Sequence, residues 1–269
     1  MRVEYDEQPN YRTKRKKKSG RSGVHALIFL LMIALSAVIA LCLTVWFNIG
    51  RIEVVGDSIY SPEQIVAASG IKQDDNLFRV NTAFAKSNIE KALPYVSDVK
   101  VTRKLPGTVK LEVSAGTEYA YINQNTGAVI IDANMKVLKD FAAPEASTIH
   151  LKGVQFNNYT VGEKLEFSGA EQNEALDELF GSLNTLGLHK GEFNVTMVDV
   201  TDVFDIKFIL DDRYYVKAGS LNNIDKKLVH LKAMLQHIDK SISGQINLAD
   251  WAEDNYKSIF KPCNIDEFK

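Results

Sequence analysis

The sequence has only two cysteines among its 269 residues, and they lie far apart. Cys42 falls inside a long apolar run and Cys263 lies near the C-terminus, so we expect no intrachain disulfide. A chain without cross-links must be held together by burial of a hydrophobic core, which excludes the class of small disulfide-stapled domains. Nothing near Cys263 suggests an activated thiol.

Charge is missing from Val24 to Phe47, where the sequence has no Lys, Arg, Asp or Glu. As a helix, Ala26–Phe47 would be about 33 Å long at about 1.5 Å per residue, which is sufficient to cross a hydrocarbon core of about 30 Å. Trp46 and Phe47 end the run, and aromatic rings suit the lipid–water boundary. The run is too long for the apolar core of a cleaved signal peptide, so it predicts one transmembrane helix over 24–47.

Basic residues are concentrated before this run. Residues 1–24 hold eight Lys or Arg against three Asp or Glu, whereas the whole chain has a net charge of −2, so the rest of the chain is acidic. The positive-inside bias places the N-terminus in the cytoplasm and residues from about 48 onward outside the cell membrane. The basic run could instead bind nucleic acid, but beside a predicted span topogenesis is the simpler account. The topogenic residues are Lys14, Arg15, Lys16, Lys17, Lys18 and Arg21.

The stretch that follows predicts a short strand and then a short helix. "RIEVVGD" places Ile52 and Val54 on one face of a strand. Ser61 is a favoured N-cap, and a proline suits the first helical position, so we expect a helix over Pro62–Ser69. Gly70 is expected to end this helix.

A second helix and a hairpin are expected next. Asn81 or Thr82 can cap this helix and Pro94 limits it. Its apolar face is predicted to consist of Phe84, Ile89 and Leu93. Two alternating runs then meet at Pro106-Gly107, which is a turn signal and indicates a hairpin with one buried face. The inward residues of that hairpin are Val99, Val101, Val109, Leu111 and Val113.

The order strand, helix, helix, strand, strand has a familiar counterpart. Together with "IEVVGDSIYSPEQI" and "VKVTRKLPGTVKLEV", it resembles the FtsQ-type POTRA domain over residues 51–117. One departure is "SAGTEYAYI" after the third strand, where that family usually has an acidic residue and a Pro-Val-Ala-like stretch. The hinge into the next domain is therefore expected to be shaped differently.

Beyond residue 118 the pattern predicts a sheet with packed helices. A β-meander covers 118–141, with Asn134 expected in a left-handed turn conformation, and a loop-rich stretch begins at His150. Apolar residues at helical spacing predict two longer helices, over 171–186 and 223–239. Strands are expected at Phe193–Val200, Val203–Leu210, Tyr214–Ala218 and, as the final one, Gly244–Leu248.

The segment "VKAGSLNNIDKKLVHLKAML…GQINLAD" resembles the second extracellular domain of the FtsQ/DivIB division proteins. With the basic head and single span, the resemblance covers nearly the whole chain. The fold class is therefore predicted to be α+β. Its segments are a cytoplasmic basic tail (1–23), a transmembrane helix (24–47), a POTRA-like domain (48–117), an FtsQ/DivIB-type β domain (118–250) and a C-terminal tail (251–269).

The patterns of catalysis are missing. No G-x-S-x-G, glycine-rich phosphate loop or cysteine cluster occurs. His230 and His237 lie seven apart on one predicted helix without metalloprotease spacing, and Asp211-Asp212 lie in a turn that favours Asp for backbone reasons. We therefore expect no enzyme and no cofactor or metal.

A predicted sheet whose last strand lies at its edge offers unpaired backbone groups to a partner strand. The resemblance implies that this edge binds single-span coiled-coil proteins of the FtsB/DivIC and FtsL type. The expected binding residues are Ile246, Asn247, Leu248, Trp251 and Tyr256, with Tyr60 as a second contact if it is not packed on the second helix. The aromatics beyond Leu248 could instead fold back onto the sheet.

The resulting functional hypothesis is a non-catalytic scaffold of the division septum that helps regulate septal peptidoglycan synthesis. It would be a single-pass protein of the plasma membrane with its C-terminal domain outside the cytoplasm. One alternative is a POTRA-containing secretion or outer-envelope assembly component. The other is an anchored extracellular enzyme.

Overall fold

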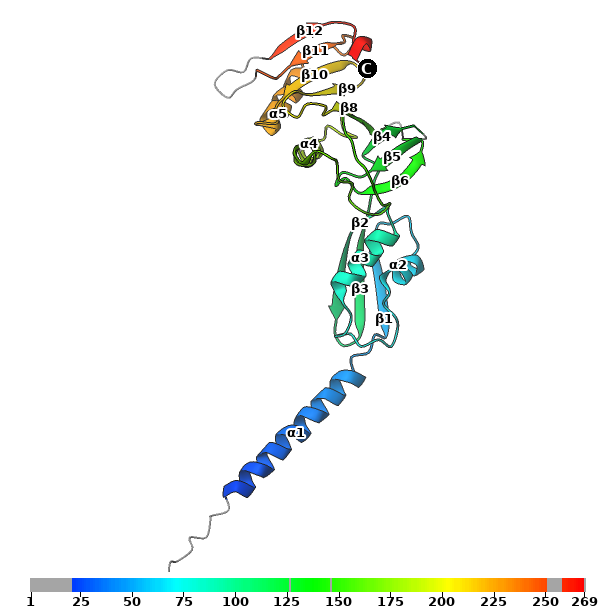
Figure 1. Cartoon of the computed structure of the whole chain (residues 1–269), viewed down its shortest axis with the longest axis vertical. Coiled ribbons are helices and arrows are strands. Elements are labelled where there is room, and N and C mark those ends of the chain that lie inside the picture. The colour runs from blue at the N-terminus through cyan, green and yellow to red at the C-terminus, as the bar shows by residue number, and fades with distance from the viewer. Residues whose placement is uncertain (1–20, 126, 146, 251–257, 269) are drawn as a thin grey trace, which may run out of the picture.

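The computed structural model describes residues 21–125, 127–145, 147–250 and 258–268. Helix α1 (Arg21–Val45) is followed by two units, each built on its own sheet (Figure 1). Across the residues that the structure describes, no helix combines the length and the apolar character that a membrane crossing requires. The transmembrane helix expected over 24–47 therefore stays a prediction.

The first unit has the predicted order of elements. These are β1 (Arg51–Gly56), α2 (Pro62–Ser69), α3 (Thr82–Ala92), β2 (Val96–Lys104) and β3 (Thr108–Ala115). The sheet order is β1-β3-β2, with β1 parallel and β2 antiparallel to the central strand β3. The N-terminal end of β1 and the β2–β3 hairpin turn therefore lie at the same end of the sheet (Figure 1).

The helix ends of the first unit follow from their capping residues. Ser61 accepts the backbone N–H of Gln64, whose side chain in turn accepts the N–H of Ser61, so α2 begins with a capping box. Gly70 ends α2 in the left-handed conformation, with φ 71°. Asn81 caps α3 by accepting the backbone N–H of Phe84.

The predicted apolar face of α3 is wrong at one position. Ile89 is fully buried and Leu93 packs against the core, but the ring of Phe84 is 62% exposed. Ala85, four residues before Ile89, occupies the inward position instead. Neighbouring residues on a helix do not share a face, so Phe84 points to solvent when Ala85 points inward.

The second unit is a nine-stranded mixed sheet with order β12-β11-β10-β9-β8-β7-β4-β5-β6. Its strands are β4 (Ala120–Gln124), β5 (Gly127–Ile131), β6 (Val137–Ala142), β7 (Ile149–Lys152), β8 (Val195–Asp199), β9 (Ile206–Leu210), β10 (Tyr214–Gly219), β11 (Gly244–Asn247) and β12 (Ile259–Pro262). Helices α4 (Ala170–Thr185) and α5 (Ile224–Leu235) join the strands in one hydrophobic core. A short 3-10 helix, η1 (Asp266–Phe268), lies near the C-terminus.

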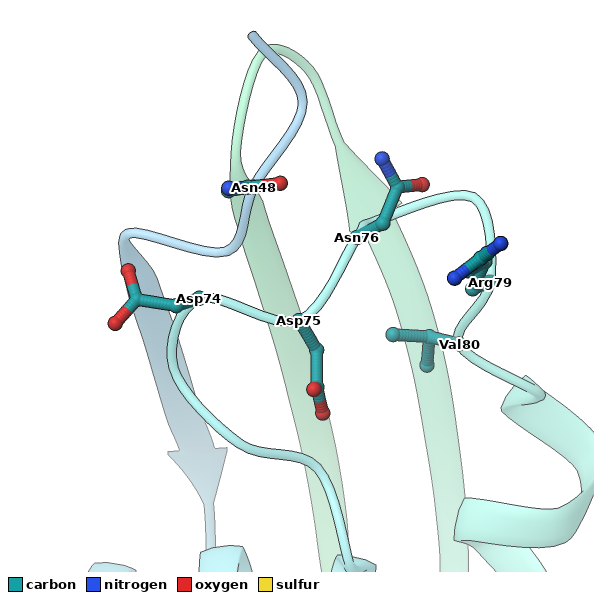
Figure 2. A pocket seen from close by; sticks show the side chains of 6 residues that line it. All are labelled: Asn48, Asp74, Asp75, Asn76, Arg79 and Val80. Atoms are coloured by element: carbon teal, nitrogen blue, oxygen red, sulfur yellow. The ribbon is translucent and has the colours of Figure 1, made fainter. Parts of the chain in front are cut away.

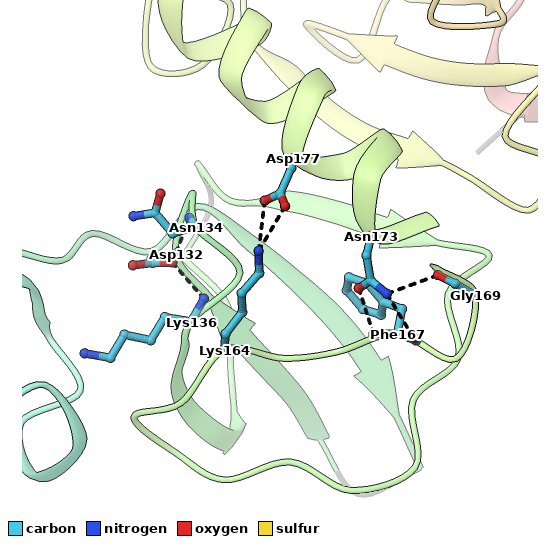
Figure 3. A network of polar contacts seen from close by, with 8 residues as sticks. All are labelled: Asp132, Asn134, Lys136, Lys164, Phe167, Gly169, Asn173 and Asp177. Carbon is cyan, nitrogen blue, oxygen red and sulfur yellow. Dashed lines mark hydrogen bonds and ion pairs between the residues drawn. The ribbon is translucent and has the colours of Figure 1, made fainter. Parts of the chain in front are cut away.

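Two local expectations in this unit are corrected. The loop-rich stretch contains β7, which pairs in parallel with both β4 and β8 and so joins the two halves of the sheet. In the turn before β6, the left-handed residue is Met135 (φ 63°) and not Asn134. The side chain of Asp132 fixes this turn by accepting the backbone N–H groups of Asn134 and Lys136, both at 2.8 Å (Figure 3).

The β6 end of the large sheet is covered by the chain's own loop. Val137 donates its N–H to Glu163 O at 2.9 Å, and its carbonyl accepts the N–H of Gly162 at 2.8 Å. The loop is tied to α4 by an ion pair of 2.9 Å between Lys164 and Asp177, and by Asn173, which bonds the backbone of Phe167 in both directions (Figure 3). The loop therefore covers the start of this edge, at Val137.

Candidate functional site

The other end of the large sheet is formed by β12, and its position corrects the predicted edge. β11 was expected to be the last strand, but it is parallel to β10 on one side and antiparallel to β12 on the other. Among the described residues, no strand pairs with the outer side of β12. The unpaired backbone thus belongs to β12, four residues that follow the segment 251–257.

Hydrogen-bond geometry shows which groups β12 presents outward. Cys263 donates its N–H to Ser243 O at 3.2 Å, toward β11. Because successive residues of an antiparallel strand point their backbone groups to alternate sides, Ile259 and Lys261 face β11 and Phe260 and Pro262 face away. Proline has no N–H, so it is tolerated on the outer side of an edge strand. Phe260 therefore supplies an outward N–H and C=O.

An apolar groove of about 420 Å³ lies beside this edge. One wall is formed by α5 and the turn after it, and the other by β12. The lining residues are His230, Ala233, Met234, His237, Ile238 and Phe260. The ring of Phe260 contacts Tyr214 edge-on, with 6.3 Å between centroids, and His230 Nε2 lies 2.9 Å from Ser258 Oγ. An apolar side chain beside an added strand would find cover here.

Helix α5 is fixed against the sheet by a buried cation. The Nζ of Lys227 donates to the carbonyls of Ala218 and Ser220, both at 2.8 Å, and the residue is 2% exposed. Burial lowers the pKa of Lys227. Ala218 lies in β10 and Ser220 follows it directly, so these bonds fix the position of α5 relative to the strands.

The C-terminal residues cover the opposite face of the sheet. Ile265 is buried among Met197, Ile209 and Tyr215, and Phe268 stacks on Tyr215 with 4.2 Å between ring centroids. Burial raises the pKa of Tyr215. Cys263 packs against the same cluster, which gives its side chain a place in the fold.

The predicted binding residues are distributed differently from expectation. Ile246 and Leu248 are fully buried in the core, so they support the edge and do not present a surface. Asn247 accepts the backbone N–H of Ala249 at 2.9 Å and so forms the turn after β11. Trp251 and Tyr256 lie outside the described residues.

Tyr60 lies in the described part of the chain, whereas most of the predicted topogenic residues do not. The Tyr60 hydroxyl accepts the backbone N–H of Tyr95 at 3.3 Å and its ring packs against the first core, so the packed alternative applies. The basic residues Lys14, Arg15, Lys16, Lys17 and Lys18 lie outside the described part. Arg21 begins α1.

Sequence reasoning missed β12 and the groove. The signal for β12 is weak, because "IFKP" is short and its proline argues against a central strand. In an edge strand, however, the same proline is tolerated. Met234 and His237 could not be assigned to a groove without knowing which strand lies beside α5.

Polar chemistry is sparse in the described part of the chain. No group of three or more His, Cys, Asp or Glu side chains there could hold a metal ion. A polar pocket of about 530 Å³ lies in the first unit, lined by Asn48, Asp74, Asp75, Asn76, Arg79 and Val80 (Figure 2). The backbone of its acidic loop binds the segment after α1: Asp74 donates its N–H to Ile49 O, and Ile49 donates its N–H to Asp75 O.

The first unit defines a class of domain. Residues 47–114 match the family model described as "POTRA domain, FtsQ-type". This match covers β1, both short helices and nearly all of the hairpin, so the first unit is a POTRA domain and the predicted fold for this region is confirmed.

Relatives extend the likeness into the second unit. The cell division protein DivIB of Clostridium botulinum strain Hall is 31% identical over 215 residues, which cover 79% of this chain and 82% of that protein. The cell division protein FtsQ of Corynebacterium glutamicum is 26% identical over 215 residues, covering 78% and 87%. DivIB of Clostridium acetobutylicum is 28% identical over 194 residues, covering 71% and 74%. The chain therefore belongs to the FtsQ/DivIB family of cell division proteins.

Proposed function

We propose that this protein is a non-catalytic scaffold of the division septum. In this proposal it binds other single-span division proteins outside the membrane and so helps regulate septal peptidoglycan synthesis. The observation that carries the proposal is the outer side of β12, where unpaired backbone groups lie beside an apolar groove. At the opposite edge of the same sheet, the loop at Gly162–Glu163 already occupies the backbone groups of Val137, where β6 begins.

Membrane anchoring is supported by the sequence and by exposed apolar side chains. The charge-free run from Val24 to Phe47 includes Leu27, Phe29 and Leu31, which are 61 to 67% exposed in α1. Such a surface is unfavourable in water and favourable in lipid. The basic residues before the run favour a cytoplasmic N-terminus, with the POTRA domain outside. The protein would then be a single-pass plasma-membrane protein concentrated at the septum.

The proposed partners are single-span coiled-coil proteins of the FtsB/DivIC and FtsL type. A partner segment in extended conformation would add as a tenth strand next to β12, with the Phe260 N–H and C=O as bonding groups. Apolar side chains of the same segment would enter the groove between α5 and β12. Backbone pairing supplies affinity in this mode, and the groove supplies specificity.

Two substitutions at one position separate backbone from side-chain recognition. Phe260→Pro removes the outward N–H while leaving the bonds between β12 and β11 in place, and we expect it to weaken capture of a DivIC-type partner at least about tenfold, equivalent to about 1.4 kcal/mol. Phe260→Leu retains the N–H and a large apolar side chain, so its effect should be smaller. The measurement is co-purification of the partner with the full-length chain in detergent, followed by titration.

The fold of each variant is checked through the Phe268–Tyr215 stack, which reports on the covered face of the same sheet. If Phe260→Pro binds the partner as tightly as Phe260→Leu and both are folded, strand addition at β12 is wrong. Trp251 and Tyr256 stay predicted contacts, and their alanine variants extend the same titration.

A further inference from the structure

Large apolar side chains are exposed at the end of the POTRA domain that α1 enters. Trp46 is 75% exposed, Phe78 51% and Leu105 67%. They come from three separate segments: the turn that follows α1, the loop between α2 and α3, and the turn between β2 and β3. We call these three residues the basal tip. Large apolar side chains exposed at one end of a domain indicate a candidate binding surface.

Phe78 is held directly against the chain that leaves α1. Its ring contacts that of Phe47 edge-on, with 5.1 Å between centroids. The residue before it, Leu77, donates its N–H to Phe47 O at 2.7 Å, and Asn48 and Asn76 form a β-bridge. Phe78 is thus fixed beside a residue only two positions beyond the end of α1.

Leu105 is held at the same end by the β2–β3 turn. Gly107 accepts the N–H of Gly50 at 2.9 Å. A Cβ at Gly107 would lie 2.4 Å from Asn48 O, so the turn can approach this closely only with glycine. The loop carrying Phe78 and the turn carrying Leu105 therefore both lie against residues 47–50.

Basic residues lie close in sequence to the basal tip. Arg51, Arg79 and Lys104 are exposed, and each is within three residues of a tip side chain or of the segment 47–50. Arg51 and Lys104 share Glu53 as an acidic neighbour, at 3.5 and 3.8 Å. Asp74 and Asp75 line the polar pocket beside Asn48 (Figure 2). Apolar side chains with flanking Arg and Lys are the combination that membrane interfaces favour.

We propose that the basal tip rests in the lipid–water interface on the outer face of the plasma membrane. Phe78 and Leu105 enter the boundary between headgroups and acyl chains, and Arg51, Arg79 and Lys104 contact lipid phosphates. This inference rests on the proposed anchoring by α1. If the span ends at Phe47, the ring contact places Phe78 at the same boundary. Three residues from Val45 to Asn48 reach at most about 10 Å, which leaves no room to lift the domain away.

Contact between the basal tip and the bilayer would also fix the orientation of the POTRA domain. A domain held only by a short chain can tilt, whereas a domain with Phe78 and Leu105 in the interface has a defined orientation. The bilayer, and not a partner protein, is the occupant, because the tip continues directly from the predicted span.

The test uses the full chain in liposomes of phosphatidylcholine and phosphatidylglycerol. The background variant carries Cys42→Ser and Cys263→Ala. Single spin-labelled cysteines then replace Phe78 and Leu105 in the basal tip, Ile59 as a control, and Leu35 inside the predicted span. Ile59 is the matched control, since it is 70% exposed but follows the opposite end of β1. Collision rates with oxygen, which prefers lipid, and with a water-soluble nickel complex are measured for each label.

We expect labels at 78 and 105 to show a higher oxygen-to-nickel ratio than the label at 59. If all three are equally accessible to the nickel complex while the label at 35 is protected, the anchor holds and the inference is overturned; the basal tip would then be free for a protein partner. A water-exposed label at 35 would instead overturn the proposed anchoring, and the inference with it.

Discussion

The hydroxyl of Tyr95 donates a hydrogen bond of 2.7 Å to Oε1 of Glu118, and this bond joins the POTRA domain to the second unit. The Nζ of Lys139 lies 2.6 Å from the same oxygen, and the Glu118 side chain is 4% exposed. Burial tends to raise the pKa of Glu118, but the bonds from Lys139 and Tyr95 outweigh burial, so the pKa is lowered and the carboxylate is charged at neutral pH. Burial and the bond to Glu118 raise the pKa of Tyr95 to about 12.

Other polar contacts cross the same boundary. The Nζ of Lys136 donates to Val96 O at 2.7 Å, and Lys91 pairs with Glu163 at 2.7 Å. Lys136 is buried, and burial lowers its pKa. Buried groups that are hydrogen-bonded across the boundary, such as Glu118 and Lys136, favour one geometry. The joint therefore fixes where the β12 edge lies relative to the POTRA domain.

A mutant cycle on Tyr95 and Glu118 measures the strength of this joint. Tyr95→Phe and Glu118→Gln are each expected to lower the free energy of unfolding by about 1.5–3 kcal/mol. The first removes a hydrogen bond to a buried carboxylate, and the second removes the negative charge that Lys139 and Tyr95 bind. The double variant should lose less than the sum of the two. Urea unfolding of the full chain gives the values. Glu112→Gln, in the surface pair with Lys110, is the control and should lower the free energy of unfolding much less.

His189 predicts a loss of stability in mild acid. Its ring packs against Tyr119 with 4.1 Å between centroids, and neither ring nitrogen has a hydrogen-bond partner. Burial, and to a lesser degree the charge of Lys190, lowers the pKa from 6.5 to about 4. The folded state thus favours neutral His189, so this contribution is complete above pH 6.5 and is lost as the pH falls toward 4.

The variant His189→Phe removes the titration and retains a ring beside Tyr119. Because His189 is partly exposed and water screens the effect, we expect the wild type to lose about 1–2 kcal/mol more than the variant between pH 6.5 and 4. Urea midpoints across this range provide the measurement. Parallel pH profiles for the two proteins would show that His189 does not titrate with folding.

The sequence predicts the POTRA region well because its signals are local. The capping box at Ser61, the left-handed Gly70 and the alternation in β2 and β3 each act within a few residues. Phe84 is the exception, since one helical turn offers both Phe84 and Ala85 as the inward residue. Only the space left by the neighbouring strands decides between them.

The candidate site is harder to predict because it depends on distant pairing. β11 has a clear strand pattern, but its position within the sheet is set by β12, which begins twelve residues after β11 ends. β7 was not predicted for a similar reason, because both of its parallel neighbours come from remote segments. Edge or interior position is a property of the whole sheet order and leaves little trace in a four-residue strand.

The corrected face of α3 gives a direct comparison. Ile89→Ala should lower the free energy of unfolding by about 2–5 kcal/mol, because it leaves a cavity in the POTRA core. Phe84→Ala removes a larger side chain that is mostly in water, so its cost should be within about 0.5 kcal/mol. Chemical unfolding of both variants settles the comparison. A larger loss for Phe84→Ala would mean that Phe84 is part of the core after all.

Gly56, the last residue of β1, should not tolerate a side chain. Its φ is 108°, and a Cβ there would lie 2.0 Å from the carbonyl oxygen of Val113, its partner residue in β3. Left-handed strain alone costs about 1–3 kcal/mol, and the backbone clash adds to it, so Gly56→Ala should cost roughly 3–5 kcal/mol. Gly50→Ala is the matched control, because a Cβ there meets nothing within 4 Å. Hydrogen exchange of the β1 and β3 amides should accelerate strongly in the first variant and little in the second. Equal exchange in the two variants would show that the end of β1 can shift away from Val113 without loss of the sheet.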